Sequence, residues 1–415
     1  MGRPLCSSPL ILVLALLATF ARAGTAAETM NDKSPNADSQ LSFNSPNSVG
    51  GTLDDTNQRK RGSLLDQLRA GKDALEASTG FAYGLDNNTQ YLRTNSDTSP
   101  SDAAGNVFRF YGTWTPTGRD TAVDGSIVFK IEDRSDIGNN LSPQSLGPSQ
   151  GYAGLYSSTF SDAGVVLTNF YWRQQFSEGR GAFVVGQVDA SDYISVNSIA
   201  SPWSGFTNLA FEQPGTLAIP SQGLGTAVLW HLNDNWGVMA GVADANGDPS
   251  DPFDSAKNLF DTGELFKHFA IGWVPDWDDR YDRSIQLTLW QADEREEAGV
   301  DDGQGIDFLA SARIGSWRPF IRAGYAEDAG VLNERAFSIG TGYDARGGLD
   351  LAGFALNWAQ APDSSRDQYT LETFYRYDVT DFLQLTPEVQ YIVNPAHDLS
   401  VSDIFVLGMR LRIFF

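Results

Sequence analysis

Charged side chains recur at spacings of two or four residues within several short apolar stretches, a spacing that suits polar recognition along one face of a β-strand. In the last stretch, Arg410 and Arg412 alternate with Met409, Leu411 and Ile413. Successive side chains leave a strand on opposite faces, so this pattern predicts a strand with one polar and one apolar face. Guanidinium and carboxylate groups form charge-assisted hydrogen bonds, which suits them to bind hydroxyl groups or ions. The candidates for such pore-lining contacts are Arg109, Lys130, Glu132, Trp203, Phe206, Arg318, Arg322, Glu372, Arg376, Glu388, Arg410 and Arg412.

The elements that must position these side chains are short segments of alternating polarity that begin near Thr79. We expect strands near residues 80–91, 107–115, 123–133, 163–175, 181–189, 223–233, 235–244, 264–274, 281–291, 305–313, 317–326, 335–343, 348–358, 368–377, 382–393 and 403–415. An even number of antiparallel strands is typical of single-chain outer-membrane barrels. The sequence therefore predicts an all-β fold, a transmembrane antiparallel β-barrel of about sixteen strands.

The connections between these strands alternate between long and short. The long ones are 134–162, 190–222, 245–263 and 292–304, and the short ones include 177–180, 233–234, 315–316 and 344–347. A soluble β-sandwich, the alternative for the last strand alone, has no reason to alternate loop length in phase with strand parity. Long extracellular loops and tight periplasmic turns are the pattern of a transmembrane barrel.

The polar faces of the strands indicate a lumen. A charge that faces lipid at the bilayer midplane costs about 2–4 kcal/mol, so the charged faces must point inward. A barrel of about sixteen strands has room for water through its middle, which predicts a pore rather than a packed core. Mixed arginines, carboxylates and aromatic rings favour a neutral polyol, whereas the alternative is a charged lumen that only holds water.

The N-terminal region has a different character from the barrel. Residues 1–23 contain an apolar run, 9–20, followed by Ala-Arg-Ala, which predicts a secretory signal peptide. Cys6, the single cysteine, lies within it. We expect a flexible leader over residues 24–62, a short periplasmic helix over 63–78 and the barrel over 79–415.

The segments 185–246 and 383–395 resemble a known family. The first contains GQVD (186–189), DY (192–193), FTN (206–208) and GVADAN (241–246); the second reads LQLTPEVQYIVNP, and LGMRL follows at 407–411. Together they resemble the carbohydrate-selective porins of the OprB type, over roughly residues 163–415. The GSLLDQL stretch at 62–68 departs from the family, because it lacks the Trp-Gly-Gly with which the family enters its first strand.

The resemblance implies a sixteen-stranded outer-membrane barrel that passes glucose-like sugars by diffusion. The expected partners are small neutral carbohydrates, outer-membrane lipid and lipopolysaccharide, and the barrel-assembly machinery through Phe415. The assembly is either a homotrimer or a monomer. A net charge of −23 argues against a nucleic-acid partner. We expect no cofactor.

Two features within the matched region carry further expectations. The connection 190–222 is long for a surface link, so we expect it to fold into the pore; an extracellular lid or trimer latch is the alternative. Pro387 lies inside a predicted strand, where it removes a ladder donor, so we expect a β-bulge there.

Other chemistries have weaker support. Asp244, Asn246 and Asp248 place oxygen ligands at alternate positions, as a calcium loop would, but a solvated acidic loop is the more ordinary interpretation. An enzyme is disfavoured, because no Ser or Asp pattern accompanies the three histidines. The arginine-rich face also leaves open a porin for small organic acids.

Overall fold

The computed structural model describes residues 43–58, 65–97, 100–119, 121–138, 141–362 and 364–415. All of these residues belong to one compact unit. The predicted signal peptide and Cys6 lie outside the described residues.

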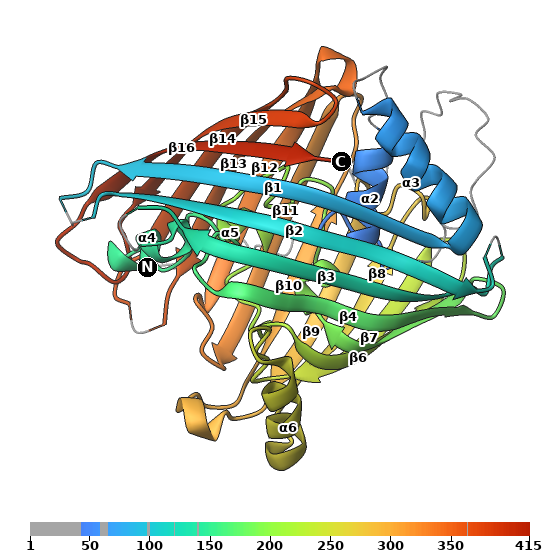
Figure 1. Ribbon diagram of the computed structural model, residues 1–415. Helices are drawn as coiled ribbons and strands as arrows, with labels where there is room; N and C mark the ends of the chain where they lie inside the picture. The colour runs from blue at the N-terminus through green and yellow to red at the C-terminus, as the bar shows by residue number, and fades with distance from the viewer. Residues whose placement is uncertain (1–42, 59–64, 98–99, 120, 139–140, 363) are drawn as a thin grey trace, which may run out of the picture. The chain divides into compact units, whose positions relative to one another are not determined.

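Sixteen antiparallel strands close into a barrel in the described part of the chain, and β1 pairs with β16 to complete it (Figure 1). The strands are β1 (Phe81–Thr94), β2 (Asp102–Thr117), β3 (Gly125–Asp136), β4 (Gly164–Phe176), β5 (Gly181–Val188), β6 (Gly223–His231), β7 (Trp236–Asp244), β8 (Leu265–Trp273), β9 (Ser284–Ala292), β10 (Gly303–Ser311), β11 (Trp317–Asp328), β12 (Arg335–Ala345), β13 (Asp350–Gln360), β14 (Gln368–Asp378), β15 (Leu383–Val393) and β16 (Asp403–Phe414). The predicted barrel is confirmed, and each expected strand is present with its ends moved by a few residues.

The two ends of the barrel differ in their connections. β1 begins and β16 finishes at the end where short turns join the strands, such as residues 177–180 and 232–235. The opposite end carries the long connections 137–163, 189–222 and 245–264. The short turns mark the periplasmic end and the long loops the extracellular end. In the described part of the chain, no helix is long and apolar enough to cross a membrane.

The faces of the strands follow the predicted parity. In β16, Leu407 is 50% exposed on the outside, whereas Arg410 and Arg412 are almost fully buried on the inside. An apolar outer wall of this kind faces lipid. The prediction of a β-bulge at Pro387 is wrong. Pro387 is paired with Met409, and the register of β15 with β14 and β16 does not shift there. The missing N–H removes a hydrogen bond without inserting a residue.

Several helices accompany the barrel. They are α2 (Val49–Gln58), α3 (Asp66–Thr79), α4 (Pro143–Ser149), α5 (Leu209–Glu212) and α6 (Pro252–Thr262), with single 3₁₀ turns η2 (Ala190–Asp192), η3 (Glu296–Ala298) and η4 (Arg346–Gly348). The helix expected over residues 63–78 corresponds to α3. It lies outside the periplasmic end of the barrel, where the indole of Trp114 donates to the Thr79 carbonyl at 3.2 Å. Gly80 ends α3 at φ 75°, a conformation that glycine adopts without steric cost, and β1 follows directly.

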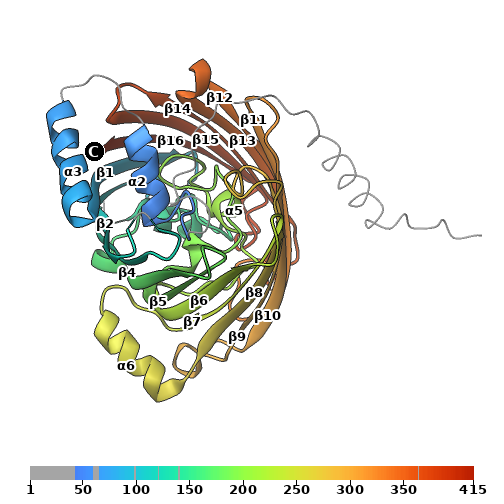
Figure 2. The same cartoon turned by 90° about the vertical axis from the view of Figure 1, so that its right-hand side faces the viewer.

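The prediction of a flexible leader over residues 24–62 is wrong for residues 43–58. These residues contain α2 and lie inside the barrel (Figure 2). Phe43, Val49 and Leu53 are buried and pack against inward side chains of β2 to β6. Those inward side chains are Tyr111, Val128, Tyr171, Ala182, Val184, Val188 and Ala227. The apolar surface that this segment buries compensates for its polar composition.

Candidate functional site

The β5–β6 connection, residues 189–222, folds into the lumen, as the sequence indicated. The guanidinium of Arg410 in β16 donates to the carbonyl oxygens of Pro202 and Gly205, the latter at 2.9 Å. The Glu372 carboxylate in β14 accepts from the backbone N–H groups of Thr207 and Asn208 at 2.9 and 3.0 Å. Charged side chains of the wall therefore form the hydrogen bonds that the backbone N–H and C=O groups of this loop would otherwise lack, because the loop has no strand partner.

A second set of contacts holds the same connection against β11 and β14. The Arg322 guanidinium donates to the Ser195 carbonyl at 2.6 Å. Phe206 lies in a buried cluster, with its ring 5.0 Å from that of Phe374 and 5.3 Å from that of Phe211. The expectation that Phe206 lines the pore is therefore wrong, because the ring is fully buried between the loop and the wall.

Trp203 of the inward loop stacks on Arg109, and Asp86 holds Arg109 in place. The Arg109 guanidinium lies 3.9 Å from the Trp203 ring centroid. The Asp86 carboxylate holds Arg109 through two hydrogen bonds, one of them 2.6 Å from Nε to Oδ1. Arg412 donates to the same carboxylate at 3.2 Å. Stacking of a paired guanidinium on an indole fixes the orientation of both groups.

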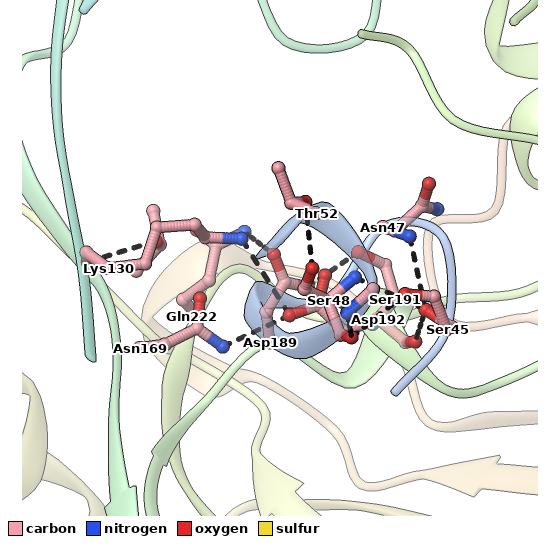
Figure 3. Close-up of polar contacts among 12 residues, drawn as sticks. Ser45, Asn47, Ser48, Thr52, Lys130, Asn169, Asp189, Ser191, Asp192 and Gln222 are labelled. Carbon is pink, nitrogen blue, oxygen red and sulfur yellow. Dashed lines mark hydrogen bonds and ion pairs between the residues drawn. The ribbon is translucent and has the colours of Figure 1, made fainter. Parts of the chain in front are cut away.

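The N-terminal segment meets the inward loop at Asp192, as Figure 3 shows. The Ser45 hydroxyl donates to the Asp192 carbonyl. The Asp192 carboxylate accepts from Asn169 at 3.1 Å and lies 3.7 Å from the Lys130 ammonium. Gln222 donates to the Asp189 carboxylate at 2.7 Å, which closes the base of the loop. The N-terminal segment and the loop are thus joined to each other as well as to the wall.

Two polar cavities lie between the wall and the inward loop in the described part of the chain. An extracellular cavity of about 420 Å³ is lined by polar groups of the wall and loops, among them Lys130, Glu132 and Glu212. A periplasmic cavity of about 750 Å³ is lined by arginines and aspartates around Arg318 and Asp344. Trp203 lines both cavities. The lumen is therefore more filled than the open pore that strand number alone suggested.

The predicted residues divide into two groups of equal size. The six that line a cavity are Lys130, Glu132, Trp203, Arg318, Arg376 and Arg412. The six that lie against the inward loop are Arg109, Phe206, Arg322, Glu372, Glu388 and Arg410. All twelve are inside the barrel; the second six position the loop without lining either cavity, and Lys130 and Arg376 of the first six contact the loop as well.

Carboxylates of the inward loop have altered acidity. Burial raises the pKa of Asp192 to about 7, although the nearby Lys130 ammonium acts in the opposite direction. Burial likewise raises the pKa of Glu212 to about 8, against the effect of a hydrogen bond from Ser158. Both side chains line the extracellular cavity, so its charge changes near neutral pH.

The acidic loop after β7 uses its oxygen atoms internally. Asp244 accepts from the Asn246 N–H and the Ser255 hydroxyl, both at 2.9 Å. Asp248 accepts from Ser250 at 2.6 Å. Among the described residues, no cluster of three or more His, Cys, Asp or Glu side chains could hold a metal ion. The contacts favour a structured turn over the calcium loop that the spacing suggested.

Two of the three histidines have packing roles. The His231 ring stacks on Trp277 with centroids 3.5 Å apart. His268 lies 5.9 Å from the Tyr193 ring and 6.1 Å from the Phe266 ring. Both rings therefore contribute to side-chain packing.

The match to a known family lies in the C-terminal strands. Residues 336–415 match the family model described as "Carbohydrate-selective porin, OprB family". The resemblance to the carbohydrate-selective porins is confirmed. The match to the OprB family covers β13 to β16 and nearly all of β12, whereas residues 185–246, which also suggested OprB, lie outside it.

Solved structures show the same fold. The high-pH structure of OprB from Pseudomonas putida has a TM-score of 0.67 at 14% identity, and covers 84% of this chain and 97% of that one. The low-pH structure of the same protein has a TM-score of 0.52 at 12% identity, and covers 86% and 99%. No curated protein matches the chain. The closed barrel, its apolar outer wall and the family match over residues 336–415 indicate an outer-membrane porin, a channel rather than an enzyme, whose C-terminal strands resemble the OprB family.

The sequence missed the N-terminal segment as part of the site. One signal was available: β5 carries apolar side chains on both faces, with Ala182 and Val184 inside and Phe183 and Val185 outside. A strand with two apolar faces predicts a covered inner wall. Phe43, Val49 and Leu53 supply that cover.

Proposed function

We propose that this porin allows passive diffusion of small neutral carbohydrates across the outer membrane. The observation that carries the proposal is the arrangement around Trp203, an aromatic ring that lines both the extracellular and the periplasmic cavity. Arg109 covers one face of the indole, and the exposed edge of the ring, 5% of the residue, offers an apolar surface to a sugar. The neighbouring polar groups offer hydrogen bonds to its hydroxyls.

The charge pattern of the inner wall supports a neutral solute. Arg109 and Arg412 share the Asp86 carboxylate, and Arg318 pairs with Asp344 at 2.8 Å. The Arg376 guanidinium lies 3.4 Å from the Asp378 carboxylate. Paired charges leave little net field for ions, whereas their remaining donors and acceptors still bind hydroxyl groups.

A porin for small organic acids remains the second candidate. The arginines of the periplasmic cavity favour it, because a carboxylate solute could replace one of their aspartate partners. Such a pore would be anion-selective, since it would use net positive charge at the constriction.

Liposome swelling separates the two candidates. Vesicles that contain the full chain are exposed to a panel of equal-sized solutes, neutral sugars and charged acids. We expect the neutral sugars to enter faster than sugar acids of the same size. Faster entry of the acids would instead support the organic-acid porin, and equal entry of all solutes would indicate a non-selective pore.

We also propose that the barrel-assembly machinery reads the last strand through Phe415. Phe415 exchanges backbone hydrogen bonds with Leu85 at 3.0 Å in each direction, which completes the seam between β16 and β1. Deletion of Phe415 should lower the yield of folded barrel in outer membranes. An unchanged yield would contradict this role.

A further inference from the structure

The helix α6 in the β7–β8 connection lies on the outside of the barrel at its extracellular end (Figures 1 and 2). Asp244 ends β7 and shares its outward parity with the exposed Trp236. The Ser255 hydroxyl of α6 donates to this Asp244 carboxylate at 2.9 Å. α6 packs against β6, and Ser255 is its buried contact residue. One face of α6 is therefore fixed to the outer wall.

The adjoining face of α6 is apolar and uncovered. Phe253 and Phe260 are 89% and 82% exposed, more than any other large apolar side chain among the described residues. They lie seven residues apart with Ala256 between them, so they share one stripe of the helix. Asp254 and Asp261 follow each phenylalanine and lie on a different, polar face. This division is typical of a helix at a membrane–water interface.

The strands next to α6 are among the shortest of the barrel. β5 has 8 residues and β6 has 9, whereas β1 has 14 and β2 has 16. With a rise of about 3.3 Å per residue and a tilt of about 45°, a nine-residue strand spans about 21 Å, less than the apolar band of about 25 Å. Lipid at the upper edge of this sector therefore reaches the level of α6.

The outer wall of this sector is apolar at the middle of its strands. Val228 in β6 and Phe269 in β8 are each 45% exposed on the outside. We propose that α6 lies in the outer-leaflet interface and inserts Phe253 and Phe260 among the lipid acyl chains. The helix thereby extends the apolar surface of the short sector to the thickness of the bilayer. The polar face with Asp254 and Asp261 remains in water.

Site-directed spin labelling tests this placement. The chain contains one cysteine, Cys6, which is replaced by serine in the full chain. Phe260→Cys is labelled with a nitroxide, and Asp261→Cys, one position along the same helix, is the matched control. The proteins are reconstituted in vesicles, and relaxation is measured with oxygen, which concentrates in lipid, and with a nickel chelate, which stays in water.

The label at position 260 should have a several-fold higher ratio of oxygen to nickel accessibility than the label at position 261. Phe253→Cys should give the same result as Phe260→Cys, which provides an independent variant if one labelled protein does not fold. Equal water accessibility at 260 and 261 would overturn the proposal. Shielding of position 260 from both reagents, with dipolar broadening between labels, would also overturn it and assign this face to a second copy of the chain.

Discussion

The two inner walls of this barrel hold their lumen segments in different ways. The wall formed by β14 to β16 is charged, and Glu372 and Arg410 bind the backbone of the inward loop. The wall formed by β2 to β6 also carries charges, but it has an apolar patch that binds Phe43, Val49 and Leu53 of the N-terminal segment. Water can replace the loop's hydrogen bonds to the charged wall, where Phe206 supplies the apolar contact with Phe374, but it cannot favourably replace the apolar side chains of the N-terminal segment.

The largest expected effect comes from a charge on the apolar patch. Leu53→Asp places a carboxylate in the cluster that α2 forms with β2 to β6. An uncompensated buried charge costs about 3–5 kcal/mol, so we expect the N-terminal segment to leave the wall while the barrel stays closed. Single-channel conductance should rise, and protease should cleave within residues 43–58. Leu53→Met, which keeps the volume and the apolar character of the side chain, is the control and should change neither property.

A smaller effect is expected on the charged wall. Glu372→Gln removes the charge that accepts two backbone hydrogen bonds from Thr207 and Asn208. A hydrogen bond to a charged group contributes about 1.5–3 kcal/mol, so the loop should detach more often and the open-channel current should become noisier. Glu334→Gln, at an exposed position in the connection between β11 and β12, is the control. Quiet currents in Glu372→Gln would show that this carboxylate does not hold the loop.

The cavity arginines should affect selectivity more than stability. Arg318 is partly exposed and pairs with Asp344 at 2.8 Å. Such pairs contribute about 0–1 kcal/mol, so Arg318→Ala should unfold at nearly the same temperature as the parent protein. It should shift the reversal potential towards cations, because Asp344 loses a partner. A large drop in the unfolding temperature with an unchanged reversal potential would place Arg318 among the loop anchors instead.

A pH dependence is expected where the N-terminal segment meets the inward loop. The pKa of Asp192 is about 7 in the folded protein because the side chain is buried, above the value of about 3.9 expected in an unfolded chain. The docked loop therefore binds more protons, and its stability falls as pH rises from about 4 to about 7. Protease cleavage within 189–222 should increase over this range. Asp192→Asn should reduce the response and leave the part that Glu212 of the same loop contributes, and an unchanged response would assign it to another group.

The barrel was predictable from the sequence because its signal is repeated in every strand. Arg410 and Arg412 alternate with apolar residues in β16. Because a charge that faces lipid is destabilising, the two arginines must point into the lumen. The direction of a side chain does not reveal what it touches. Arg322 and Arg318 share a face of β11, yet one binds the loop backbone and the other lines a cavity, because the loop covers only part of the wall.

The N-terminal segment was not predictable from its own composition. Residues 43–58 are mostly polar, and three side chains, Phe43, Val49 and Leu53, carry the packing. Their partners lie on five different strands, so the contact exists only after the barrel closes. Gly408 shows the same dependence: a Cβ there would lie 2.4 Å from the Glu388 side chain across the strand pair, which explains the glycine only once the pairing is known.

The most direct test of sugar passage is current block in planar bilayers. Ion current through the full chain is recorded while a glucose-like sugar is added, and the Trp203→Ala variant is measured beside it. We expect weak ion selectivity, block of the parent channel by sugar, and a half-blocking concentration about tenfold higher in Trp203→Ala, a loss of about 1.4 kcal/mol. Strong anion selectivity without sugar block in the parent channel would contradict the account.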